Sequence, residues 1–101
     1  MSDRKLLLQL GITPNYKGFF LLLSALELLR SQPRAILSVT KQLYPAIADI
    51  YNLSWKTVER DLRTIVSRAW DCNAAMLQKV AGFPITDCPT VAQFLAILVE
   101  R

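Results

Sequence analysis

The stretch Pro45–Thr64, PAIADIYNLSWKTVERDLRT, has the pattern of two short helices joined by a tight corner. Asparagine tolerates left-handed backbone better than most residues, so Asn52 suits the corner itself. Ser54 follows as a good N-cap for the second helix, worth about 1 kcal/mol. Leu53 and Val58 occupy the two positions of a hydrophobic staple, which fixes the angle at which the chain enters a helix. The stretch therefore predicts two helices at a defined angle.

The apolar residues of this segment fall on the inner sides of both expected helices. In the first helix Ala48 is the small residue at which the second helix crosses, and we expect its neighbours Ile47 and Ile50 to face the core. Apolar residues of the second helix are spaced four, three and four apart, which makes a narrow stripe at 100° per residue. We therefore expect a helix-turn-helix over about residues 44–70. The stripe consists of Val58, Leu62, Ile65 and Ala69.

The opposite side of the second helix is polar and mostly basic. Such a face, starting at the N-terminus of the second helix, is what a helix-turn-helix inserts into the major groove of DNA. A basic triplet at this spacing is also common on solvated surface helices, so that alternative stays open. The corner, the cap and the staple favour DNA binding. The face holds Lys56, Arg60, Arg63 and Ser67, with Glu59 and Thr64 at its edges.

The rest of the chain is also helical in pattern, and no segment alternates for long enough to be a strand. We therefore predict an all-α fold. Gly18, inside one expected helix, either costs about 1 kcal/mol relative to alanine or lets a neighbouring backbone approach closely. Thr90 is expected to cap the last helix, and Thr13 the second. The expected helices cover residues 2–10, 16–30, 34–43, 44–51, 54–70, 73–80 and 91–101.

Length and composition limit the function further. The 101 residues suffice for one domain, expected over residues 1–101, and the net charge of +4 mildly favours an anionic partner. With no histidine, Ser-His and Cys-His catalysis and His-ligated zinc are excluded, so we expect no enzyme, no metal and no cofactor. Neither a membrane span nor a signal peptide is visible, so a cytoplasmic location without a membrane partner is expected. Cys72 and Cys88 form no CxxC pair, and we expect reduced, half-buried packing residues.

Several short motifs are shared with one known family. They are Leu10-Gly11-Ile12, Lys17-Gly18, the run Val39 to Ala48 (VTKQLYPAIA), Val58-Glu59-Arg60 with Arg63, Ala69-Trp70, and Pro89-Thr90 with Phe94 and Ala96. In these residues, the chain resembles the C-terminal DNA-binding effector domain of the sporulation initiation (stage-zero) response regulator family. The likeness covers about residues 10 to 100. The combination of TKQLYPAIA with VERDLR and AW is far more specific than a generic helix-turn-helix.

The resemblance implies a domain of about six helices that binds promoter double-stranded DNA sequence-specifically, as a homodimer or as tandem copies. It adds a σ factor of RNA polymerase as a candidate partner. Glu59, Arg60 and Arg63 match the family's motif positions and are expected to read bases. Arginine suits the O6 and N7 acceptors of guanine, and a glutamate either accepts from cytosine N4 or orients a neighbouring arginine. Backbone or peripheral DNA contacts are expected from Ser54, Trp55, Lys56, Thr57, Thr64 and Ser67.

The chain departs from the family pattern in two respects. These residues contain no receiver domain, which normally precedes the effector domain in the family. Trp55 and Lys56 stand where small or polar residues are usual, and Thr64 stands where histidine is frequent. An exposed tryptophan is typical of protein–protein hot spots. The alternative function is therefore a helical protein-interaction module that keeps the fold but does not bind DNA.

Overall fold

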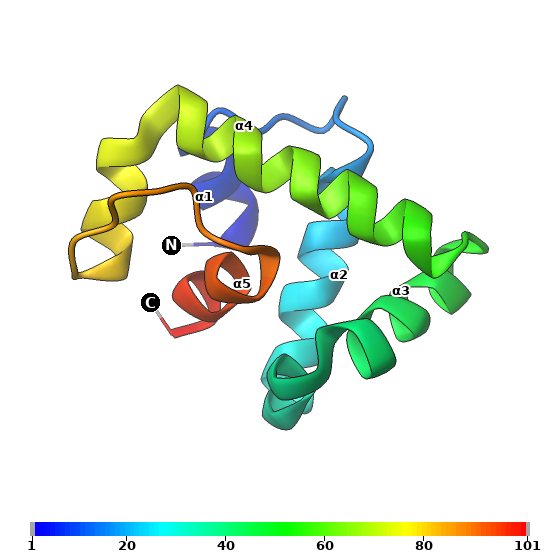
Figure 1. The fold of residues 1–101 in the computed structure, drawn as a ribbon. Coiled ribbons are helices and arrows are strands. Elements are labelled where there is room, and N and C mark those ends of the chain that lie inside the picture. Colours follow the sequence, from blue (N-terminus) through cyan, green and yellow to red (C-terminus); the bar gives the residue numbers. More distant parts are fainter. Residues whose placement is uncertain (1, 101) are drawn as a thin grey trace.

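A computed structural model describes residues 2–100, in which helices are the only regular elements (Figure 1). The all-α prediction is confirmed. Five α-helices are present in the described chain, against the seven expected from the pattern and the about six implied by the resemblance. The helices expected over 54–70 and 73–80 are joined, and the segment expected as a helix over 34–43 is not α-helical. The α-helices are α1 (Asp3–Gln9), α2 (Gly18–Ser31), α3 (Tyr44–Tyr51), α4 (Trp55–Ala81) and α5 (Val91–Glu100), with a 3₁₀ segment η1 (Pro33–Ser38) and a π segment η2 (Val39–Leu43) between α2 and α3.

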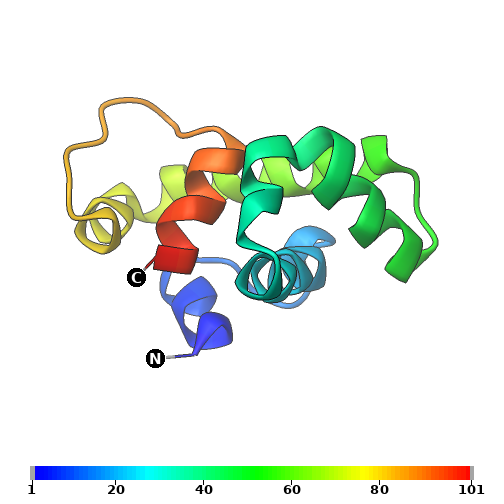
Figure 2. The same ribbon diagram turned by 90° about the horizontal axis from the view of Figure 1, so that it is seen from below.

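The apolar helix α2 runs through the middle of the molecule, and α4, α5, η1 and α3 all pack against it (Figures 1 and 2). Phe19 and Leu26 of α2, Leu62 of α4 and Phe94 of α5 are fully buried together. Each such side chain contributes about 1.5–3 kcal/mol by leaving water. Most of the other apolar residues of α5 are buried within the same core, so this helix serves the fold of its own chain. They are Val91, Leu95, Ile97 and Leu98.

Gly18 lies at the crossing of α2 and α4, where there is no room for a side chain. Of the two explanations for this glycine, the close approach of a neighbouring backbone is confirmed. The predicted cap of α2 is wrong, because the helix begins at Gly18 after Lys17 and the Thr13 hydroxyl bonds the side chain of Asn15 instead. The position of α4 relative to the core therefore depends on a glycine.

The segment from Pro33 to Tyr44 is not the regular helix that was expected over residues 34–43. It forms a 3₁₀ turn and then a π turn, in which the N–H of Tyr44 donates to the carbonyl of Val39, five residues back. Pro45 has no N–H and cannot continue an ordinary helical ladder, so the bonding pattern is redistributed before α3 begins. After this segment the chain enters α3, which packs against α4.

Helix α4 bends sharply at Asn73, whose φ of −156° and ψ of 62° are not helical. Its side-chain oxygen accepts from the N–H of Met76 at 3.2 Å, so Asn73 restarts the helix as an N-cap does. Its amide nitrogen donates to the carbonyl of Gln9 at 3.1 Å, which ties the bend to the end of α1. The break expected between residues 70 and 73 is therefore present as a bend, visible in Figure 1 where the ribbon turns from olive to yellow.

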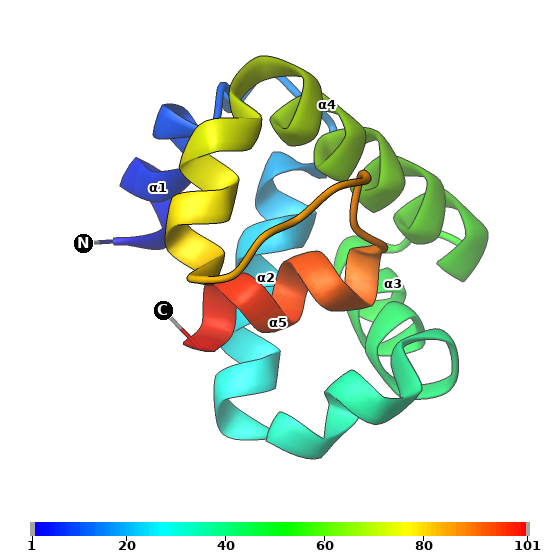
Figure 3. The same ribbon diagram turned by 60° about the vertical axis from the view of Figure 1, so that its left-hand side comes forward.

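The loop between α4 and α5 returns along the molecule towards the first half of α4, as Figure 3 shows. Gly82 ends α4 in a left-handed conformation at φ +77°. Thr90 caps α5 as expected: its hydroxyl accepts from the N–H of Gln93 at 3.2 Å, and the Gln93 side chain accepts from the N–H of Thr90 at 2.9 Å. The loop thus brings the start of α5 beside the first half of α4.

Candidate nucleic-acid interface

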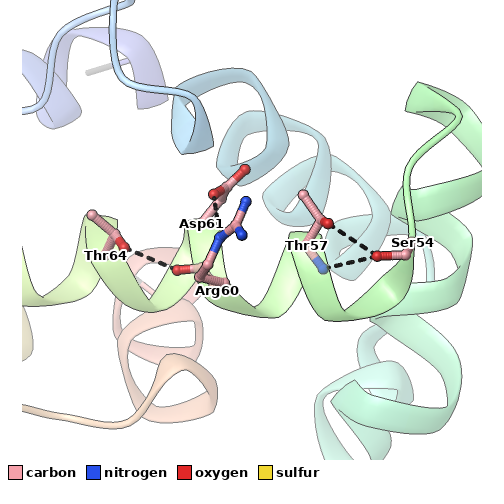
Figure 4. A network of polar contacts seen from close by, with 5 residues as sticks. All are labelled: Ser54, Thr57, Arg60, Asp61 and Thr64. Carbon is pink, nitrogen blue, oxygen red and sulfur yellow. Dashed lines mark hydrogen bonds and ion pairs between the residues drawn. The ribbon is translucent and has the colours of Figure 1, made fainter.

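The corner between α3 and α4 has the geometry that its residues predict. Asn52 is left-handed, with φ 54° and ψ 48°, and is the one non-glycine residue with positive φ among residues 2–100. The N–H groups of Asn52 and Leu53 both donate to the carbonyl of Ala48, a closure common at helix C-termini. Ser54 then caps α4, accepting from the N–H of Thr57 at 3.2 Å. These bonds fix the direction in which α4 leaves the corner, and Figure 4 draws the bonds between Ser54 and Thr57.

Helix α3 faces the core with Tyr44, Ile47 and Ala48, which are buried. The expectation that Ile50 faces the core is wrong, since Ile50 is 60% exposed. Its position, six residues after Tyr44, turns it away from the stripe that Tyr44, Ile47 and Ala48 define. Tyr51 continues this stripe, and its hydroxyl bonds the Ser24 hydroxyl at 2.6 Å and donates to the Phe20 carbonyl at 3.2 Å. The first helix of the motif is therefore anchored on α2.

The inner stripe of α4 is buried as predicted, and the outer face is exposed. The stripe gains Val66 and, unexpectedly, the carboxylate of Asp61. Leu53 is exposed at the corner while Val58 is buried, so a staple contact between them stays a prediction. The exposed residues of the outer face are Lys56, Arg60, Arg63, Thr64 and Ser67, with Glu59 partly buried at one edge.

A shallow groove follows the middle of this exposed face. Arg68, which the sequence patterns did not single out, adds a third guanidinium beside Arg60 and Arg63, and it lies over the Tyr16 ring at 5.7 Å. The groove is open to solvent and mostly basic, as a surface for a phosphate backbone must be. Its lining consists of Arg60, Arg63, Thr64, Ser67, Arg68 and Asp71.

Two arginines of the face are each paired with a carboxylate of α4. Arg63 donates from Nη2 to Oε1 of Glu59 at 3.0 Å, one helical turn away. Arg60 donates from Nε to Oδ1 of Asp61 at 3.5 Å, drawn in Figure 4. Exposed pairs of this kind add little stability, but they restrict where a guanidinium points. Glu59 therefore contacts an arginine of the face, one of the two roles considered for it.

The corner and the first three turns of α4 carry residues that are predicted to make peripheral contacts with DNA. The hydroxyls of Ser54 and Thr57 bond each other at 3.0 Å, and the Thr64 hydroxyl donates to the Arg60 carbonyl at 3.0 Å (Figure 4). Trp55 is 39% exposed, and Nζ of Lys56 lies 5.7 Å from the centre of its ring. A cation over an aromatic face is attracted by the ring quadrupole. Two of the three side chains expected to depart from the family pattern, Trp55 and Lys56, therefore lie against each other.

Tyr44 connects the two helices of the motif electrostatically. Burial raises the pKa of its phenol above the ordinary value of 10.0, and the nearby Glu59 carboxylate raises this pKa further, against the opposing effect of Arg63. Tyr44 and Arg63 also line one crevice together with Ser67 and the residues that lead into α5. A buried phenol on α3, with a raised pKa, therefore lies near the Glu59–Arg63 pair.

The sequence patterns did not indicate three features of this surface. They are the burial of Asp61, the presence of Arg68 beside the other arginines, and the position of Tyr44 near Glu59. Asp61 lies four residues after Thr57 and four before Ile65, so a helical wheel places it at the margin of the buried stripe. That position was a usable signal for Asp61. No local pattern indicates the approach of Tyr44 or the stacking of Arg68, because their partners lie on other segments.

The described residues offer little to other kinds of site. Between Ser2 and Glu100 no group of three histidine, cysteine or acidic side chains could hold a metal ion. None of the described helices is both long and apolar enough to cross a membrane. Cys72 and Cys88 are free thiols, and both are exposed, contrary to the half-buried positions expected for them.

The comparison with known families matches this arrangement. A family model described as "Sporulation initiation factor Spo0A C terminal" matches residues 4–101, nearly the whole chain. This family comprises regulatory DNA-binding domains and is not an enzyme family. The capped corner and the basic face of α4 are what such a domain requires. The chain therefore belongs to the family of sporulation initiation factor C-terminal domains, which are DNA-binding domains of transcription regulators.

Proposed function

We propose that this chain binds specific double-stranded DNA sequences, with the first half of α4, about residues 54–70, in the major groove. The observation that carries the proposal is the exposed basic face, which begins directly at the capped N-terminus of α4. Helix-turn-helix proteins present their recognition helices in this way. The left-handed Asn52 and the bonds of Tyr51 to α2 hold that end of the helix in place.

Arg60 and Arg63 are the proposed base readers, since a guanidinium can donate two parallel bonds to guanine O6 and N7. Glu59 is proposed as a third reader that accepts from cytosine N4. Its bond to Arg63 at 3.0 Å supports a shared role, in which the two side chains read adjacent positions together. The proposed backbone contacts, which set the register of the helix on DNA, are Ser54, Trp55, Lys56, Thr57, Thr64 and Ser67.

Selection of bound sequences from a random duplex pool, followed by titration of the selected duplex, tests this proposal. Arg60→Ala should weaken binding to the selected duplex by about 1–3 kcal/mol and relax preference at one base pair. Arg34→Ala, an exposed arginine of η1 away from α4, is the matched control and should leave that preference unchanged. Equal affinity of Arg60→Ala and wild type for the selected duplex would contradict a base-reading role.

Pairing on DNA and contact with a σ factor of RNA polymerase are further proposals that rest on the family alone. Tandem or dimeric binding predicts that two protein molecules occupy a selected duplex carrying two adjacent sites. Band shifts on duplexes with one and two sites measure the number bound. A two-site duplex that at saturation migrates like the one-site duplex with a single bound molecule would contradict it.

A protein-interaction module is the second candidate, favoured by the exposed apolar side chains of Ile50, Leu53 and Trp55 around the corner. Surface clusters of this kind often mark protein interfaces. Salt dependence distinguishes the two candidates, because neutralising phosphates releases counterions and makes binding weaker at high salt. If no duplex shows salt-dependent binding, the interaction module becomes the better explanation.

A further inference from the structure

Among residues 2–100, Asp61 is the one charged residue that is buried. The DNA-binding proposal gives it no role. Burying a carboxylate is costly unless a partner compensates for the lost water. The partner that Figure 4 draws is Arg60, whose Nε donates to Oδ1 of Asp61 at 3.5 Å. A buried acid is thus paired with one of the two arginines that are proposed to read bases.

The two members of this pair are held very differently. The side chain of Asp61 is 11% exposed, and the backbone of Asp61 packs against Gly18 at the crossing of α2 and α4. The side chain of Arg60 is 68% exposed, on the open face of α4. The acceptor is therefore fixed by the core, while the donor extends into solvent. Such a contact adds little to stability but limits the directions of the guanidinium.

The atom that Asp61 engages is important for recognition. A guanidinium has five N–H donors, and guanine is recognised by two of them in parallel. Asp61 occupies Nε–H, the donor nearest the chain, and the terminal Nη1 and Nη2 groups extend past it. These two groups form a fork that matches O6 and N7 of guanine. The contact orients Arg60 without using the donors that the base requires.

Arg63 is held in the opposite way. Its contact with Glu59 uses Nη2, one of the terminal donors, at 3.0 Å. Both side chains stand on the exposed edge of α4, with 70% exposure for Arg63 and 30% for Glu59. To present a two-donor terminal fork to guanine, Arg63 has to release or share this bond. The two arginines therefore begin from different states before DNA arrives.

We propose that Asp61 is a positioning residue that orients Arg60, so that Arg60 is the pre-organised guanine reader while Arg63 must first exchange its contact with Glu59. This inference rests on the proposed DNA binding and adds how that site obtains its specificity. Ordering a side chain before binding lowers the entropy lost on binding. Asp61 therefore contributes to specificity without touching DNA.

The test uses duplexes in which each guanine of the selected site is replaced in turn by 7-deazaguanine, which lacks the N7 acceptor. Inosine, which keeps N7 and O6, serves as the matched control. Wild type should lose about three- to tenfold in affinity at the guanine read by Arg60, roughly half of a bidentate pair. That guanine is identified as the one at which Arg60→Ala is insensitive to the replacement.

Asp61→Asn keeps the size of the side chain and removes its charge. We expect this variant to lose most of the sensitivity to 7-deazaguanine at the Arg60 position, while the matched control Asp87→Asn, at an exposed aspartate of the loop before α5, keeps it there. A merely structural role would weaken all duplexes alike and leave the ratio between guanine and 7-deazaguanine unchanged. If Asp61→Asn keeps the full wild-type ratio, or if no guanine N7 matters to wild type, the positioning role is refuted.

A second measurement does not depend on DNA or on the folding of the variant. The Nε–H group of Arg60 in the free wild-type protein should be more ordered by ¹⁵N NMR relaxation than that of exposed Arg34. Equal mobility of the two groups would overturn the inference. Failure of the wider function is distinguishable, since it appears as absence of any preferred duplex while the Arg60 Nε–H remains ordered.

Discussion

Gly18 of α2 lies directly against the backbone of Asp61 on α4. A Cβ atom added at Gly18 would stand 2.7 Å from the Asp61 carbonyl oxygen and 2.5 Å from Cγ1 of Ile65. Backbone cannot move aside as a flexible side chain can, so this contact sets the separation of the two helices. The proposed recognition helix α4 is therefore positioned by Gly18, which lies 43 positions before Asp61 in the chain.

Gly18→Ala should lower the free energy of unfolding by about 1–3 kcal/mol, because overpacking outweighs the better helix propensity of alanine. Urea denaturation measures the change. Gly82→Ala is the matched control: nothing lies within 4 Å of its added Cβ, so only the left-handed backbone is penalised, by about 1 kcal/mol. A Gly18→Ala variant as stable as wild type would contradict the close contact.

The left-handed corner gives a second prediction. Asn52→Ala should destabilise the protein by about 1 kcal/mol, since alanine resists positive φ, whereas Asn52→Gly should cost less. Thermal and urea unfolding of the two variants measure the difference. If the Asn52→Gly variant is less stable than Asn52→Ala, the left-handed backbone is not the reason for an asparagine at this position.

The raised pKa of Tyr44 predicts a loss of stability in alkali. The folded protein keeps this phenol neutral to a higher pH than the unfolded chain does, so its contribution is complete below pH 10. As the pH rises above that value through the folded pKa, the contribution is lost. Tyr44→Phe should therefore remove part of the alkaline fall in unfolding free energy.

Paired urea titrations of wild type and Tyr44→Phe at pH 8 and at pH values above 10 measure this effect. The difference between the two proteins should be constant up to about pH 10 and change above it. A difference independent of pH throughout the alkaline range would mean that Tyr44 titrates alike in the folded and unfolded states.

Lys56 tests the separation of phosphate contacts from base contacts. Lys56→Ala should weaken binding to selected and random duplexes by similar factors and reduce the slope of log K against log salt by about 1. Arg60→Ala should instead act mainly on the selected duplex. Equilibrium titrations at several salt concentrations measure both slopes. A selective loss on one sequence after Lys56→Ala would assign the lysine to base recognition.

Local chemistry explains why the corner could be predicted from the sequence. Asn52, Ser54 and Thr90 act on backbone groups within five residues of themselves, so their roles follow from residue type and spacing. The buried stripe of α4 is equally local, because a helical period places its apolar residues on one side. These features needed no knowledge of the rest of the fold.

Other features of the fold were predicted wrongly from the sequence or were not predicted. The π turn before α3 arises because Pro45 removes a donor within an apparently helical pattern, and the pattern alone shows only a helix. The hydrophobicity of Ile50 suggests burial, but its angle on α3 turns it to solvent, so the prediction for this residue is wrong. The contact between Asp61 and Gly18 joins segments far apart in the chain, so no local spacing could reveal it. Which bases Arg60 and Arg63 read stays a prediction.

The break at Asn73 divides α4 into two helices, and the rotation of side chains about the second axis is not fixed by that of the first. A residue inserted between Trp55 and Asn73 would rotate everything after it by about 100° relative to the rest, separating the basic face from the buried stripe. A residue inserted after Asn73 would leave Arg60 and Arg63 in register, because the chain restarts its helix there through the bond to Met76. We therefore expect insertions and deletions in related chains after Asn73 and not between Trp55 and Asn73.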